Sequence, residues 1–150
     1  MVTVSLTTDW GASGLYTGLF KAKLVQRLPG VQIVDISHQI EPYKVPDAVF
    51  ALKNAITYFA PKTIHIVSVA DRSKNREFIC FQYNYQYFIG PNNGLWEMLF
   101  DDVPEKVYKI EAVKKNVQGS FSESDIFVDV ISKLSMGLSP ERIGVPIDFY

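Results

Sequence analysis

Hydrophobic and polar residues follow two alternating patterns along the first half of the chain. β-rich runs occupy residues 2–8, 31–36 and 63–70, and the nearly continuous apolar run at 31–36 is typical of a parallel strand covered on both faces. Between these runs, apolar residues recur every three or four positions over 15–28 and 46–59, which predicts two amphipathic helices. This order predicts β-α-β crossovers, and therefore a parallel sheet with helices on both faces.

The second half of the chain departs from this alternation. Residues 78–83 and 87–89 are β-rich and flank a polar turn, which predicts a hairpin appended to the sheet. Further elements are expected as a short helix at 94–100, a strand at 106–110 and a helix at about 125–136. The tail at 138–148 contains two prolines and predicts two or three turns of structure at most. Together the patterns predict a three-layer α/β/α domain with a mainly parallel, Rossmann-like sheet.

Composition and charge fit a single globular domain. The 150 residues (17.0 kDa) suffice to bury one hydrophobic core, and 47% hydrophobic against 21% charged residues exclude a disordered chain. Fifteen basic and sixteen acidic residues leave a net charge of −1, with no basic run. Nucleic-acid binding depends on clustered Lys and Arg that neutralise phosphates, so this balance argues against a nucleic-acid partner.

The sequence shows no signal for membranes, export or metals. No apolar stretch approaches the roughly twenty residues that a membrane helix needs, and the N-terminus lacks signal-peptide features, so we expect a cytoplasmic protein. The single cysteine, Cys80, leaves neither an intrachain disulfide nor a Cys-based zinc site. The two isolated histidines, His38 and His65, are expected to be hydrogen-bonded structural residues, and no metal site is predicted.

Polar residues at the ends of the predicted strands are the first candidates for a ligand site, because doubly wound sheets bind ligands there. Asp9 follows the first strand, and its carboxylate can accept hydrogen bonds from a vicinal diol such as a ribose. Capping of the following loop or helix is an equal alternative for Asp9. His38 follows the second strand. Asp71, Arg72 and Arg76 follow the third, in a composition that by itself is also typical of a solvated loop.

Four segments, in order, resemble the motifs of one known family. They are residues 7–11 (TTDWG), 34–43 (VDISHQIEPY), 58–67 (YFAPKTIHIV) and 88–94 (FIGPNNG). Their order and spacing are similar to those of the S-adenosylmethionine hydroxide adenosyltransferases, relatives of fluorinase and chlorinase. The resemblance identifies residues 1–150 as a single domain of the family's N-terminal type, without the usual β-rich C-terminal domain.

The resemblance implies an activity and an assembly. Members of this family bind S-adenosylmethionine as their substrate, without a further cofactor. Water attacks ribose C5′ of this substrate, which yields adenosine and methionine. The family implies a homotrimer in which the ligand lies between the first domain of one subunit and the second domain of a neighbour. The expected function is therefore that of an adenosine-forming S-adenosylmethionine hydrolase.

Matching positions imply the substrate-binding residues. Asp9 would hold the ribose hydroxyls, and Tyr43 would pack on the nucleoside. Tyr16 falls near the ribose end of the site, and Phe121 would line the pocket. Asn93 belongs to a matching motif, although a structural role in its own turn is an equal alternative.

The match is poorer for the catalytic residues. The family orients and activates water with an Asp, an Arg and a His. Asp71 and Arg76 are the expected equivalents of the first two, with Arg72 as a rival for the Arg. Ser122 stands in place of the His, and a hydroxyl can orient water but not usefully accept its proton. Water without a metal is a very weak acid at neutral pH, so a base must take its proton, and Asp71 is the expected base.

The segment at 121–125 keeps other interpretations open. Glu123 places a carboxylate where it repels a halide ion, which argues against halide chemistry. Ser122 and Asp125 have the spacing of a capping-box variant, so this segment has a purely structural alternative as the start of a helix. Loss of the His favours a second function, a catalytically inactive module that binds S-adenosylmethionine or adenosine, or that only forms the trimer.

Overall fold

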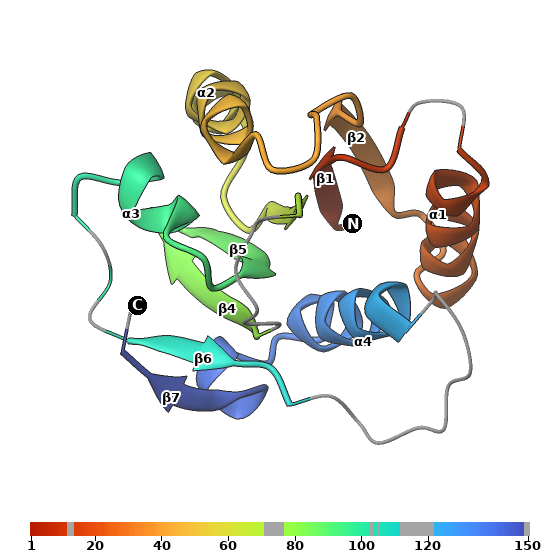
Figure 1. Cartoon of the computed structure of the whole chain (residues 1–150). Coiled ribbons are helices and arrows are strands. Elements are labelled where there is room, and N and C mark those ends of the chain that lie inside the picture. Colours follow the sequence, from red (N-terminus) through yellow and green to blue (C-terminus); the bar gives the residue numbers. More distant parts are fainter. Residues whose placement is uncertain (12–13, 71–76, 103, 105, 112–121, 149–150) are drawn as a thin grey trace.

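The computed structural model describes residues 1–11, 14–70, 77–102, 104, 106–111 and 122–148, with the backbone alone at Ser122 (Figure 1). The strands are β1 (Thr3–Thr8), β2 (Gln32–Ser37), β3 (Ile64–Ser68), β4 (Phe78–Tyr83), β5 (Gln86–Pro91), β6 (Val107–Lys109) and β7 (Val145–Ile147). The helices are α1 (Leu15–Arg27), α2 (Val45–Ala55), α3 (Leu95–Leu99) and α4 (Ser122–Ser135), with short 3-10 helices η1 (Ile56–Tyr58) and η2 (Pro140–Arg142). Strands and helices therefore alternate up to β3, where the β4–β5 hairpin follows.

The strands of the described residues form one sheet in the order β2-β1-β3-β5-β4-β6-β7. β1 pairs in parallel with β2 on one side and with β3 on the other, and β3 pairs in parallel with β5. The pairs β4–β5, β4–β6 and β6–β7 are antiparallel. The chain leaves β1 toward β2 and then returns past β1 to β3. The switch point of a doubly wound sheet therefore lies between the ends of β1 and β3.

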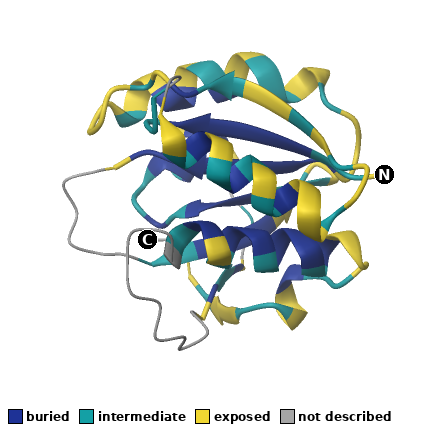
Figure 2. Ribbon diagram, turned by 90° about the vertical axis from the view of Figure 1, so that its right-hand side faces the viewer, coloured by how far each residue is buried: buried dark blue, intermediate teal, exposed yellow. Residues whose placement is uncertain are grey.

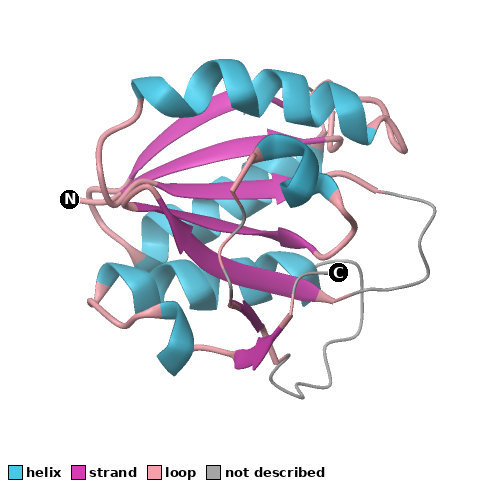
Figure 3. Ribbon diagram, turned by 90° about the vertical axis from the view of Figure 1, so that its left-hand side faces the viewer, coloured by secondary structure: helices cyan, strands magenta, loops and turns pink. Residues whose placement is uncertain are grey.

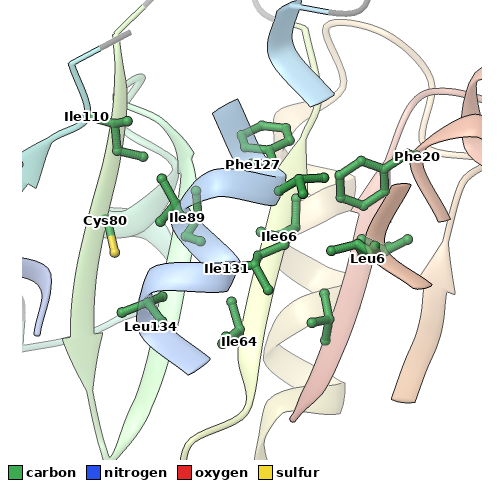
Figure 4. Close-up of a cluster of buried hydrophobic side chains, with 14 residues drawn as sticks. Leu6, Phe20, Ile64, Ile66, Cys80, Ile89, Ile110, Phe127, Ile131 and Leu134 are labelled. Carbon is green, nitrogen blue, oxygen red and sulfur yellow. The ribbon is translucent and has the colours of Figure 1, made fainter. Parts of the chain in front are cut away.

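Helices cover both faces of the sheet, which confirms the expected α/β/α class (Figure 3). On the face of α1 and α4, Phe20 and Phe127 pack edge to face with 6.3 Å between ring centroids (Figure 4). The buried hydrophobic residues that the structure describes form two clusters, one on each face of the sheet. On the face of α2 and α3, Trp96 is fully buried in one of these clusters. Burial of one such side chain stabilises a fold by roughly 1.5–3 kcal/mol, so these two layers hold the buried central strands firmly (Figure 2). None of the described helices is long and apolar enough to cross a membrane.

The predicted hairpin joins the sheet through β5, which pairs with β3, while β4 continues the sheet to β6. Asn84 and Tyr85 at its turn both have positive φ values, 49° and 65°. Positive φ at both central residues is the requirement of a type I′ turn, whose twist matches that of the flanking strands. The turn therefore keeps β4 and β5 in register.

Residues 31–36 were expected to form a strand covered on both faces, and β2 forms there with each face only partly covered. β2 lies at the edge of the sheet, and both Val34 and Asp35 are exposed. Ile33 packs against one hydrophobic cluster and Ile36 against the other, so one apolar side chain covers each face of this strand. An apolar run indicates a strand, but it does not show how many strands flank it.

The tail forms a strand, β7, which the sequence did not predict. β7 pairs antiparallel with β6, with Pro146 opposite Tyr108. Gly144, just before this strand, lies so close to β6 that a Cβ atom there would come within 2.4 Å of the Lys109 carbonyl oxygen. A proline is tolerated in an edge strand because one of its sides needs no hydrogen-bond donor. The absence of a side chain at Gly144 lets the tail approach β6.

Candidate functional site

The carboxyl ends of β1 and β3 lie side by side at the switch point. Thr8 pairs with Ser68 in the parallel ladder, and the Asp9 amide donates a hydrogen bond to the Ser68 carbonyl oxygen (3.0 Å). Doubly wound sheets bind ligands in the crevice outside such a pair of strand ends. The structure therefore places Asp9 where a ligand-binding carboxylate is expected.

Asp9 and Tyr43 converge on the backbone of Ala70. The Asp9 Oδ2 atom accepts a hydrogen bond from the Ala70 amide (2.8 Å), and the Ala70 carbonyl oxygen accepts one from the Tyr43 amide (2.8 Å). Within the described part of the chain, no hydrogen bond engages Asp9 Oδ1. Tyr43 is 55% exposed and has a φ of 70°, a costly conformation for a bulky residue and one that clusters at binding sites. Two predicted substrate-binding residues thus contact the same residue, Ala70, just beyond the end of β3.

A chain of hydrogen bonds runs from this turn to the protein surface. The Trp10 amide donates to Thr8 Oγ1 (3.2 Å), which lies 2.6 Å from His38 Nδ1. His38 Nε2 lies 2.6 Å from Asp35 Oδ1, and the Lys21 ammonium donates to Asp35 Oδ2 (2.5 Å). Burial alone would raise the pKa of Asp35, but hydrogen bonds from Lys21 and His38 hold that pKa below its ordinary value. The carboxylate is therefore charged at neutral pH.

His38 also holds the turn through its backbone and its ring. Its carbonyl oxygen accepts a hydrogen bond from the Gly11 amide (2.8 Å), and its imidazole stacks on the Trp10 indole with 6.0 Å between centroids and 17° between planes. Gly11 has a φ of 87°, which residues with a side chain rarely adopt. The turn at residues 9–11 is thus held by β3 on one side and by the segment after β2 on the other.

The Trp10 indole connects this turn to α1 and α4. Tyr16 packs edge-on against it, with 4.7 Å between centroids, and Trp10 Nε1 donates a hydrogen bond to Ser68 Oγ (3.2 Å). The Ser68 hydroxyl donates in turn to Glu123 Oε1 (2.5 Å). Burial, together with the negative charge of Glu123, raises the pKa of Tyr16 above its ordinary value. The described part of the site therefore combines aromatic rings with two carboxyl groups, those of Asp9 and Glu123.

Comparison with known proteins decides the family. Residues 4–144 match the family described as the SAM hydroxide adenosyltransferase N-terminal domain. The chain belongs to this family. Several relatives are named (R)-S-adenosyl-L-methionine hydrolase. That of Methanocaldococcus jannaschii is 26% identical in an alignment of 133 positions that covers 85% of this chain and 51% of the relative. That of Thermus thermophilus is 27% identical in a gapped alignment of 163 positions that covers 99% of this chain and 63% of the relative.

Solved structures agree with this membership. An uncharacterized conserved protein from Thermotoga maritima matches with a TM-score of 0.80 and 32% identity, over 98% of this chain and 58% of that one. A conserved hypothetical protein from Thermus thermophilus matches with a TM-score of 0.74 and 25% identity. This match covers 99% of this chain and 59% of that one. The SAM hydroxide adenosyltransferase domain described here thus spans between 51% and 63% of the length of these proteins.

Several residues that the family resemblance points to fall outside the described part of this SAM hydroxide adenosyltransferase domain. Asp71, Arg76 and its rival Arg72 lie there, and so does Phe121. Ser122 is the first residue of α4, and its side chain is not described. Their catalytic and binding roles stay predictions.

Asn93 takes part in the turn that starts α3. Its Oδ1 atom accepts a hydrogen bond from the Leu95 amide (3.1 Å), across Gly94 with a φ of 85°. Such a local hydrogen bond is a common way to order the entry to a helix. This contact supports the structural alternative for Asn93, and a role in binding substrate stays a prediction.

His65 belongs to a second buried network, away from the strand ends. Its Nδ1 atom lies 2.5 Å from Ser5 Oγ, and its Nε2 atom is hydrogen-bonded to Gln86 Oε1. The Gln86 amide nitrogen donates to the carbonyl oxygens of Ile56 and Phe59 (3.1 Å each). Burial lowers the pKa of His65 to about 4, so the ring is neutral at pH 7. Both histidines are hydrogen-bonded as expected, and no group of three or more His, Cys, Asp or Glu among the described residues is arranged to hold a metal.

Proposed function

We propose that this domain forms part of the active site of an adenosine-forming S-adenosylmethionine hydrolase. One observation carries the proposal. The Asp9 carboxylate lies at the switch point with one oxygen bound to the Ala70 amide, and no hydrogen bond of the described residues engages the other oxygen. A carboxylate with spare acceptor capacity can bind the vicinal hydroxyls of a ribose. Relatives named (R)-S-adenosyl-L-methionine hydrolase support S-adenosylmethionine as the substrate.

The proposed reaction joins a water oxygen to ribose C5′ and breaks the bond between C5′ and the sulfonium sulfur. Both electrons of the broken bond stay on sulfur, so methionine leaves as a neutral thioether. The proton of the water passes to Asp71, while Arg76 stabilises the developing hydroxide and Ser122 orients it. Because hydroxide and sulfonium neutralise each other on attack, a pocket that excludes water favours the transition state.

The remaining contacts are proposed to come from a second domain and from a trimer. The relatives are longer than this chain, which spans 51% to 63% of their length. A homotrimer would place the second domain of one subunit against the first domain of the next, where it contacts the adenine and the methionine carboxylate. We expect a particle of three chains in light scattering, and a monomer would contradict this assembly. A cytoplasmic location is likewise part of the proposal.

Incubation with S-adenosylmethionine, followed by mass spectrometry of adenosine and methionine, tests the hydrolase function. We expect both products from the wild-type protein and a rate at least about tenfold lower for Asp9→Ala, since a charged hydrogen-bond acceptor is lost. Asp101→Ala removes an exposed carboxylate in the loop after α3 and serves as the matched control. Equal rates for Asp9→Ala and the wild type, or no product from either, would contradict the proposal.

A second function, ligand binding without hydrolysis, is favoured by Ser122 at the position where the family has a His. Calorimetry with S-adenosylmethionine distinguishes the two functions. Binding without any product indicates the binding module. If turnover then appears or rises in Ser122→His, the low activity of the wild type is due to the absence of the His.

A further inference from the structure

We propose that His38 is a positioning residue for Asp9. Through the Thr8 hydroxyl, its imidazole sets the peptide that joins Asp9 to Trp10, and thereby the direction of the Asp9 carboxylate. The inference rests on the proposed function, in which Asp9 binds the ribose. His38 does not need to touch the substrate, because it is 7% exposed and hydrogen-bonded at both ring nitrogens.

The direction of each hydrogen bond in this chain follows from its partners. The charged Asp35 carboxylate can only accept, so His38 Nε2 carries a hydrogen and donates it. The oxygen of the fully buried Thr8 hydroxyl accepts from the Trp10 amide, and the hydroxyl hydrogen is donated to His38 Nδ1. A hydrogen on His38 Nε2, with Nδ1 accepting from Thr8, therefore satisfies every group in the chain.

The Asp9 side chain is directed because both peptides beside it are fixed. The Asp9 amide donates to the Ser68 carbonyl oxygen, and the Trp10 amide donates to Thr8 Oγ1. The next amide, that of Gly11, donates to the carbonyl oxygen of His38. Peptide groups are planar, so these three bonds leave the Asp9 carboxylate only its own side-chain torsions. The Ala70 amide then fixes one carboxylate oxygen.

Variants at Thr8 and His38 test this inference. Thr8→Val removes the hydroxyl with little change in shape, whereas Thr8→Ser keeps the hydroxyl. His38→Phe keeps a flat ring against Trp10 but removes both ring nitrogens. We expect Thr8→Val and His38→Phe to weaken S-adenosylmethionine binding by about tenfold in calorimetry, the effect of one lost buried hydrogen bond, and Thr8→Ser to stay within about twofold.

A double variant separates positioning of Asp9 from general damage. If Thr8 acts through the Asp9 carboxylate, Thr8→Val causes little further loss of affinity once Asp9→Ala has removed that carboxylate. Losses that simply add in the double variant would overturn the inference. Gln86→Ala disturbs the His65 network instead, and it should leave affinity unchanged at a temperature where every variant is folded.

Spectroscopy keeps this inference separate from the proposed function. A wild-type protein that does not bind S-adenosylmethionine contradicts the function, and the backbone amide signals of residues 9–11 in 1H–15N NMR spectra then decide the inference. Thr8→Val must shift these signals, and Thr8→Ser must leave them near their wild-type positions. The imidazole 15N shifts of His38 must indicate a hydrogen on Nε2 at pH 7. Amide signals that do not shift in Thr8→Val, or an Nε2 atom without a hydrogen, would overturn the inference.

Discussion

The two buried histidines of this domain lie in similar hydrogen-bonded chains that end in different ways. Each ring nitrogen Nδ1 faces a hydroxyl of β1, Thr8 for His38 and Ser5 for His65. The His38 chain ends at Asp35 and Lys21, whose side chains are 41% and 33% exposed. The His65 chain ends at the neutral amide of Gln86. One network therefore reaches solvent through charges, while the other is closed within the fold.

This difference indicates what each network does. The Gln86 amide bridges β5 to the backbone of Ile56 and Phe59, so the His65 network joins three strands to the segment after α2. The His38 network joins the segment after β2 to a turn at the strand ends. We therefore expect changes at His65 to act mainly on the free energy of unfolding, and changes at His38 to act mainly on ligand affinity.

The largest expected effect is that of His65→Ala on stability. The variant opens a space between Phe59 and Phe88, whose rings lie 5.0 Å from the imidazole, and leaves the buried Ser5 hydroxyl without its partner. We expect the free energy of unfolding to fall by about 4 kcal/mol in urea denaturation. His38→Ala also leaves a buried hydroxyl, that of Thr8, without its partner, but its other partner Asp35 reaches solvent, so we expect a smaller loss of about 2 kcal/mol. Equal losses would contradict the comparison.

Acid should destabilise the protein through His65. The pKa of His65 is about 4 in the folded protein and 6.5 when unperturbed, so the unfolded chain binds a proton at a higher pH than the folded protein does. The stabilising contribution is complete above pH 6.5 and is lost as the pH falls toward 4, up to about 3 kcal/mol. Urea midpoints measured between about pH 7 and pH 4.5 check this, and His65→Gln should flatten the profile.

Asp35→Asn tests the charged end of the other network. The amide oxygen still accepts a hydrogen bond from His38, but Lys21 loses its counter-ion, so we expect a loss of about 1 kcal/mol at pH 7. The pKa of Asp35 is lowered by folding, so the wild type loses this contribution only as the pH falls below the ordinary carboxyl range. Asp101→Asn is the exposed control, and a similar loss there would contradict the role of the ion pair.

The smallest effect is expected on the ionisation of Tyr16. Burial and the charge of Glu123 are the two main causes that raise the Tyr16 pKa, so Glu123→Gln should lower that pKa. A 13C NMR titration of labelled tyrosines measures this shift. No such shift is expected from Gln86→Ala, which lies in the uncharged network. A pKa that rises in Glu123→Gln would show that the charge of that carboxylate is not what raises it.

Much of the fold could be predicted from the sequence, because hydrophobic periodicity directly reports which residues a helix or strand can bury. The strands before and after α1 and α2 were expected, and so was the β4–β5 hairpin. The edge position of β2 could not be predicted, because it depends on the order of strands that are distant in sequence. β7 was missed because a strand of three residues with a proline at its centre carries no periodic signal.

The site was predictable only where a residue type and a strand end coincide, as at Asp9. Ala70 takes part through its backbone amide, and the type of a side chain does not predict such a contact. Ser68 lies in a buried β-rich run, where a hydroxyl is indistinguishable from a packing residue until Trp10 and Glu123 are placed around it. Asp35 and His38 are close in sequence, but their link to Thr8 depends on the pairing of β1 with β2.

The Asp35 carboxylate lies on the exposed edge strand β2, where its charge has an effect besides holding His38. Among the described strands, β2 ends the sheet, it contains no proline, and Val34 is exposed on it. An open edge with apolar side chains is a template on which a strand of another molecule can add. Asp35 lies on this edge beside Lys21, and an added strand would have to strip water from both charges. We therefore expect the ion pair that anchors His38 also to disfavour the addition of a strand at this open sheet edge.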